Sequence, residues 1–192
     1  MDWKKNILSK RWEERYNNLS DEVKRRLKWL DEQKIKDIQL RVIKRKRDYP
    51  EIGSIFKLNP KEELYLHGIV INNHIKNNNG DDLLIVVIFR EGVNIKESLS
   101  GGIKKDDLLL RPTIVGKEYW TRGYFYNIDK FETNNLVGRY GFYSIGKRIF
   151  CDEYGAKLDL EPELLGVYGV STVYGIAMEI TKELIILSEG TY

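Results

Sequence analysis

The hydrophobic pattern of the chain is dominated by one run of seven consecutive apolar residues, Leu83–Phe89. The run follows Asp81-Asp82, precedes Arg90, and contains four β-branched residues. Seven residues are far too few to cross a lipid bilayer. Their length, β-branching and polar brackets predict a central strand that is buried on both faces. We therefore expect the rest of the chain to supply covering layers.

The first thirty residues show apolar positions at helical spacing instead. A first stripe is formed by Trp3, Ile7, Leu8, Trp12 and Tyr16, and a second by Val23, Leu27 and Leu30. Asn17-Asn18 separates the two stripes, and Ser20 is a favourable N-cap for the second helix. Helices this short are marginal in isolation. The pattern predicts a helical hairpin that docks on the body.

After Pro50 the pattern changes to short alternating segments separated by turn residues. We predict strands over 53–58 and 64–71, polar or long loops over 72–82 and 90–107, and an edge or broken strand over 108–115. Gly68 inside the second strand indicates a bulge or a close backbone approach. Glycines next to aromatic residues are typical of bent sheets. The predicted fold is mainly β (α+β), with an N-terminal helical hairpin followed by a strongly bent antiparallel sheet or small β-barrel.

The C-terminal pattern is ambiguous. Asp152–Gly155 predicts a hairpin turn between 149–151 and 156–158. Beyond it, one alternating set suits a strand, namely Val170, Thr172, Tyr174, Ile176, Met178 and Ile180. The spacing of Ile176, Ile180, Leu184 and Leu187 fits a closing helix instead. Periodicity alone leaves the stretch 175–188 open between the two.

Length and composition indicate one globular domain with an appended element. We expect a helical N-terminal extension with a basic connector over 1–47 and a mainly β domain over 48–192. The 192 residues are 42% hydrophobic, enough for a core that needs no covalent staple. The single cysteine, Cys151, excludes a disulfide within the chain. The sequence shows neither a secretory signal nor a membrane span, so the expected location is cytoplasmic.

The net charge of +3 hides an uneven distribution. Residues 1–50 carry 16 bases and 9 acids, whereas residues 151–192 carry 2 bases and 8 acids. The segment 34–47 alone holds seven bases and one acid. It is either a nucleic-acid patch or a solvated connection whose Ile38, Leu40 and Val42 face inward. We favour the second interpretation and expect no specific nucleic acid as partner.

Candidate chemistry is sparse. His74, Asp81 and Asp82 offer metal-ligand types, and Cys151 with His67 offers a nucleophile and a base. Surface polarity explains the first group equally well, and a cysteine beside an aromatic residue is more often a small core residue. We predict no catalytic residue, no cofactor and no metal, and hence a protein that is not an enzyme.

Four segments together show a resemblance. They are Gly53-Ser54-Ile55-Phe56, Tyr65-x-x-Gly68-x-Val70, the apolar strand, and Trp120-Thr121-Arg122-Gly123-Tyr124-Phe125. Over about residues 45–190 the chain resembles the immunity protein 26 family of bacterial polymorphic toxin systems. The resemblance implies a mainly β protein that binds a cognate toxin domain and neutralises it by occlusion, without catalysis. The alternative is a nucleic-acid-binding module that uses the basic segment 34–47.

The acidic C-terminal region is the predicted toxin-facing surface, since loops on a rigid sheet often carry binding residues. Acidic residues would steer association with a basic toxin. The acidic residues of this predicted surface are Asp152, Glu153, Asp159, Glu161 and Glu163. Trp120 and Tyr124 are its predicted aromatic anchors, because interfaces are often held by such side chains.

Overall fold

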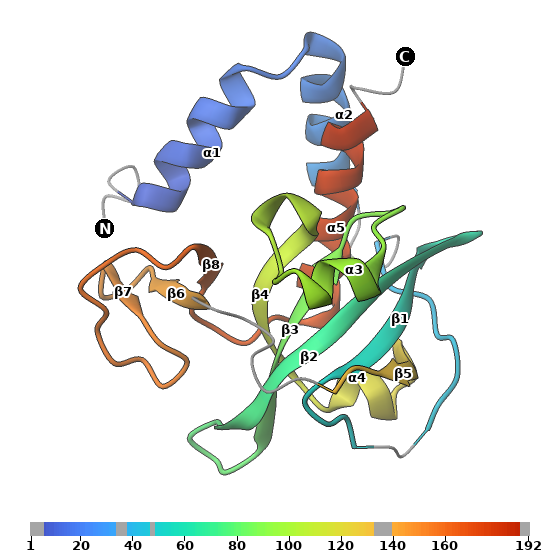
Figure 1. Ribbon diagram of the computed structural model, residues 1–192. Coiled ribbons are helices and arrows are strands. Elements are labelled where there is room, and N and C mark those ends of the chain that lie inside the picture. Colours follow the sequence, from blue (N-terminus) through green and yellow to red (C-terminus); the bar gives the residue numbers. More distant parts are fainter. Residues whose placement is uncertain (1–5, 34–37, 47–48, 133–139, 189–192) are drawn as a thin grey trace.

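A five-stranded antiparallel sheet forms the centre of the protein, in the order β4-β3-β2-β1-β5 (Figure 1). The computed structural model describes residues 6–33, 38–46, 49–132 and 140–188. The strands of this sheet are β1 (Ser54–Lys61), β2 (Leu64–Lys76), β3 (Asp82–Phe89), β4 (Leu108–Gly116) and β5 (Phe125–Lys130). Strand β3 lies between β2 and β4, and all of Leu83–Phe89 is buried. The predicted central strand is confirmed.

Each face of the sheet carries its own apolar cluster, because successive side chains of a strand point to opposite sides. Val86 and Ile88 join the first cluster, and Ile85 and Val87 join the second. The first face is covered by the helices α2 (Asp21–Asp31), α4 (Glu118–Thr121) and α5 (Val173–Leu187). The second face packs against α3 (Ile95–Ser100) and a smaller sheet. Cover on both faces of the sheet therefore explains why residues Leu83–Phe89 of β3 are all apolar.

The smaller sheet has the order β7-β6-β8 and lies beside β4 (Figure 1). Its strands are β6 (Tyr140–Ser144), β7 (Ile149–Cys151) and β8 (Leu164–Val167). Strand β6 pairs antiparallel with β7 and parallel with β8. The two sheets touch closely at Gly166, where an added Cβ would stand 2.0 Å from the backbone oxygen of Pro112.

The N-terminal hairpin forms as predicted. Helices α1 (Ile7–Asn17) and α2 flank a short link, and the Ser20 hydroxyl accepts a hydrogen bond from the Val23 amide (3.3 Å). The stripe of α2 is buried against α5, whereas α1 buries none of its residues. Two ion pairs tie α1 to the body, Arg11–Glu161 and Arg15–Glu183, each at 2.6 Å. The hairpin thus docks mainly by the packing of α2, and α1 adds the two ion pairs and the partly buried Tyr16.

Three sequence expectations need correction. Strand β2 continues to Lys76 through the predicted polar loop, because Ile75 is buried within it. The predicted loop 90–107 contains α3 and a 3-10 turn, Lys105–Asp107. Val42 is 53% exposed, although Ile38 and Leu40 are buried as expected. Residues 34–37 and 47 of the basic segment lie outside the described residues.

The sheet is bent but open. Each of its four strand pairings contains a register shift, which increases local twist. Strands β4 and β5 are its two edges, so the five described strands form a bent sheet and not a closed barrel. Pro112 lies in the edge strand β4, as predicted. The ambiguous stretch 175–188 lies in helix α5 up to Leu187, and Ser188 is the helix C-cap. No helix within the described ranges is long and apolar enough to cross a membrane.

Candidate protein-binding groove

Three of the five acidic residues predicted to face a toxin bind other parts of the chain. The Asp152 carboxylate accepts hydrogen bonds from the amides of Tyr154 (2.9 Å) and Ala156 (2.8 Å), which closes the predicted turn. The Glu153 carboxylate accepts one from the Tyr140 hydroxyl (2.9 Å). These carboxylates hold the smaller sheet in shape.

Glu161, the third of these bonded acids, lies at the surface together with Asp159 and Glu163. Glu161 accepts two hydrogen bonds from the Arg11 guanidinium, at 2.6 and 2.7 Å, and Arg11 thereby lowers the pKa of this carboxyl. Asp159 and Glu163 are exposed, and the structure shows no hydrogen bond or ion pair for them among the residues it describes. Of the predicted acidic set, these two have no internal bonding that competes with a partner.

Trp120 is a core residue and not a surface anchor. Only 2% of it is exposed, and its ring packs edge-on against Phe56 and Phe125 at centroid distances of 5.4 and 5.1 Å. Its indole N–H donates to the Asn127 side-chain oxygen (2.7 Å). Tyr124 is half-buried against the same cluster. Trp120 therefore fills the sheet's first face, and its predicted role as a surface anchor is corrected, whereas that of Tyr124 stays a prediction.

The candidate catalytic groups are not brought together. Cys151 is fully buried, and burial raises the pKa of its thiol, which is the opposite of what an activated nucleophile needs. Burial lowers the pKa of His67, which lies opposite Lys57 on β1. No hydrogen bond between Cys151 and His67 appears in the described structure. Within the same ranges, no group of three or more potential ligands could hold a metal ion.

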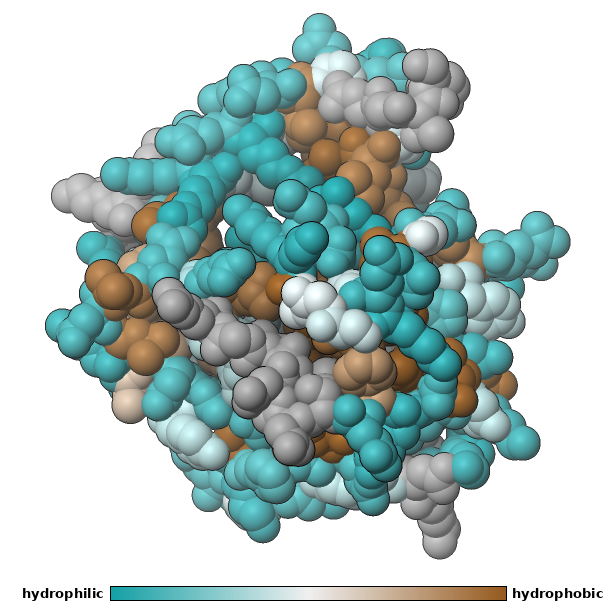
Figure 2. Space-filling view, in the orientation of Figure 1, coloured by the Kyte–Doolittle hydropathy of each residue, from teal (hydrophilic) through white to brown (hydrophobic). Residues whose placement is uncertain are grey.

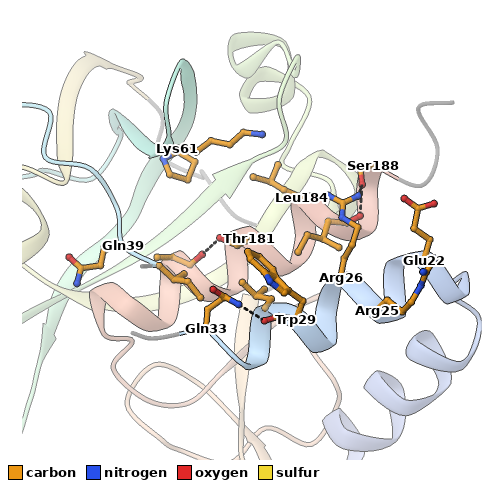
Figure 3. Close-up of a pocket in the computed structure, with 15 residues that line it drawn as sticks. Glu22, Arg25, Arg26, Trp29, Gln33, Gln39, Lys61, Thr181, Leu184 and Ser188 are labelled. Carbon is orange, nitrogen blue, oxygen red and sulfur yellow. Dashed lines mark hydrogen bonds between the residues drawn. The ribbon is translucent and has the colours of Figure 1, made fainter. Parts of the chain in front are cut away.

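A groove lies between α2, α5 and the end of β1, with a volume of about 750 Å³. Figure 3 shows Trp29 of α2 and Thr181 and Leu184 of α5 pointing into a common space, with Lys61 of β1 on the opposite wall. The apolar part of the lining comes from Leu30, Ile38, Pro60, Ala177, Leu184 and Ile185. The space-filling view in Figure 2 shows hydrophobic residues reaching the surface where α2 and α5 lie. The groove thus has an apolar floor that remains accessible.

Trp29 stands out on this rim. Its neighbour Leu30 belongs to the buried stripe, and one residue along a helix turns the side chain by about 100°. Trp29 therefore lies beside the packed interface and is 60% exposed. Sequence reasoning missed Trp29, because it considered only the apolar residues at helical spacing, Val23, Leu27 and Leu30. A tryptophan one position away from that stripe was the signal in the sequence that could have indicated an exposed aromatic residue.

The charged part of the rim is predominantly basic. Arg25, Arg26 and Lys61 line the groove together with the single acid Glu22. The Arg26 guanidinium donates to the Ser188 hydroxyl (2.7 Å), which holds one cation at the α5 end. The segments 34–37 and 189–192, adjacent in sequence to the lining residues Gln33 and Ser188, lie outside the described residues. An apolar floor with a basic rim suits an amphipathic segment with acidic flanks.

Comparisons with protein-family models, with curated proteins and with solved structures found no match to this chain. Membership of the immunity protein 26 family therefore remains a prediction from the segments that carry the resemblance.

Proposed function

We propose that this protein is a binding protein that neutralises a partner protein by occlusion, as an immunity protein does with its cognate toxin. The exposed Trp29 above an accessible apolar groove is the observation that carries the proposal. A large aromatic ring beside a pocket is the usual form of a binding hot spot. The proposed occupant is an apolar segment of the toxin domain, flanked by acidic residues.

The basic rim supports this choice of occupant. Three cations against one carboxylate raise the local concentration of an acidic partner and disfavour a basic one. This differs from the sequence-based interface, which offered acidic residues to a basic toxin. The change follows from the structure around Asp152, Glu153 and Glu161, since all three already bond within the chain.

The test uses the product of the neighbouring gene, expressed as its C-terminal domain and titrated with this protein. We expect a complex whose dissociation constant rises by roughly 30-fold in Trp29→Ala, the equivalent of about 2 kcal/mol for a hot spot. Trp12→Ala is the matched control, because Trp12 is also surface-exposed (38%) but lies on α1, outside the groove lining. Cells carrying the toxin domain should survive with the wild type and lose protection with Trp29→Ala.

Two outcomes would refute the proposal. One is a complex that Trp29→Ala leaves as tight as the wild type, which would place the interface elsewhere. The other is the absence of any complex with the neighbouring product. A variant ending at Ser188 separates partner binding from any effect of residues 189–192, and it should retain the wild-type affinity.

A further inference from the structure

A second surface, separate from the groove, lies on the open part of the sheet's second face. There Lys57 of β1 pairs in register with Tyr126 of β5 on one side and with His67 of β2 on the other. The Lys57 ammonium lies 5.2 Å from the ring centroid of Tyr65 and 5.6 Å from that of Tyr126. Tyr65 is 50% exposed. Two tyrosines, one exposed and one half-buried, therefore flank one half-buried lysine on this face.

A basic segment, residues 38–46, runs along the same edge of the sheet and is joined to β1 by an isolated bridge between Arg41 and Asn59. The Arg41 amide donates to the Asn59 carbonyl (2.8 Å) just beyond the point where β5 stops pairing with β1. The Ile43 amide donates to the Gly123 carbonyl (2.8 Å). The described residues 38–46 hold four bases and no acid, and the bases Arg41, Lys44, Arg45 and Lys46 are all exposed.

The nearby carboxylates do not cancel this charge. Glu62 pairs with Arg41 at 3.3 Å, and Asp129 pairs with Lys96 at 3.4 Å. Each of these two acids is thus matched by its own cation, and within the described residues the structure shows no ion pair for Lys57, Lys44 or Arg45. Exposed aromatic rings beside cations on an open sheet form the arrangement that binds single-stranded nucleic acid by stacking and by phosphate contacts.

We infer that this face binds single-stranded nucleic acid without sequence preference. Bases stack on Tyr65 and Tyr126, and phosphates contact Lys57 and the cations of the segment 38–46. Stacking on a tyrosine needs no particular base, because every base offers a π-face. A duplex keeps its bases stacked on one another and cannot use the two rings, so it should bind more weakly.

The experiment measures fluorescence anisotropy of a labelled twelve-nucleotide oligothymidine, and of the corresponding duplex, at several salt concentrations. We expect single-strand binding that exceeds duplex binding and weakens as salt is added. Tyr65→Ala and Tyr126→Ala should each lower the affinity roughly 5-fold or more. Lys57→Gln should reduce the salt dependence by about 0.7 in slope, the value for one lost phosphate contact on a single strand.

Tyr154→Ala is the matched control, because Tyr154 is 65% exposed but lies on the turn of the smaller sheet. It should bind the oligonucleotide as the wild type does, and so should Trp29→Ala, which disables only the groove. Circular dichroism confirms that each variant is folded. The inference is overturned if the oligonucleotide does not bind, if the duplex binds as tightly, or if both tyrosine variants behave like Tyr154→Ala.

Discussion

The sharpest test of the central packing is Gly68→Ala. A Cβ at Gly68 would stand 2.4 Å from the Phe56 ring and 2.6 Å from the backbone oxygen of Val87, whereas ordinary contacts begin at 3.4 Å. Both neighbours would have to retreat by roughly 0.8–1.0 Å. The Phe56 ring is fully buried and stacks on Phe125 at 4.3 Å, and the Val87 oxygen belongs to the neighbouring strand, so neither moves freely.

Overpacking of this kind costs about 1–3 kcal/mol, while replacement of glycine by alanine returns about 0.4–1 kcal/mol through the unfolded chain. The two clashes together place the expected loss of unfolding free energy near 2 kcal/mol, or about 4–8 °C in melting temperature for a chain of this size.

Thermal and urea unfolding, followed by circular dichroism, measure this loss. Gly146→Ala is the control, since a Cβ there meets nothing within 4 Å and the backbone angle is ordinary. It should leave the melting temperature unchanged or slightly higher. In a double-mutant cycle, Phe56→Leu should reduce the destabilisation caused by Gly68→Ala by at least about 1 kcal/mol. The smaller leucine side chain leaves free part of the space that the new Cβ needs. If Gly68→Ala melts within 1 °C of Gly146→Ala, the close approach of β1, β2 and β3 at Gly68 is wrong.

Two further predictions concern the charged contacts of the N-terminal and C-terminal regions. Replacing Glu161 and Glu183 by glutamine removes the ion pairs with Arg11 and Arg15 of α1. We expect faster amide hydrogen exchange in α1 alone. The melting temperature should change little, because exposed ion pairs contribute only about 0–1 kcal/mol each. Arg11 lowers the pKa of Glu161 below its unfolded value of 4.5, so this ion pair stabilises the fold above pH 4.5 and its contribution is lost as the pH falls further. Amide exchange in α1 of the wild type should therefore accelerate in acid. The Glu161→Gln variant should not show this acceleration. Asp152→Ala removes two hydrogen bonds from the turn after β7 and should lower the unfolding free energy by about 1–2 kcal/mol, whereas Asp159→Ala, an exposed acid nearby, should stay within about 0.5 kcal/mol.

Local patterns in this chain were sufficient where one physical effect dominates. Seven apolar residues at Leu83–Phe89 need cover on both faces, and Ser20 with its buried stripe specifies the start of α2. The asparagine-rich stretch misled because Asn72 is bonded within the fold, donating to Tyr140 and Glu153 at 3.0 Å each. A polar residue with distant partners looks like a loop residue in the sequence.

The proposed binding surfaces are harder to predict than the fold, because they are assembled from distant parts of the chain. The groove joins Trp29 to Leu184, and the tyrosine pair joins Tyr65 to Tyr126 across β1. Trp120 shows the opposite error: an aromatic residue near a glycine suits a surface anchor in the sequence, but in the structure it is buried in the core of the sheet's first face. Exposure depends on which neighbour arrives, and a single sequence does not contain that information.

The position of α5 in the chain affects how the protein is made. Strands β1 to β4 form a meander of neighbouring strands that can pair as soon as they are synthesised, but their first face is covered in part by α5, which ends about 70 residues after β4. At a ribosomal rate of about 5–20 residues per second, that interval lasts roughly 4–14 s. During this time Phe56, Val86 and Ile88 belong to a sheet that lacks one of its covering helices. The nascent chain therefore passes through a period in which it depends on low concentration or on chaperones, and translation speed between β4 and α5 becomes a determinant of yield.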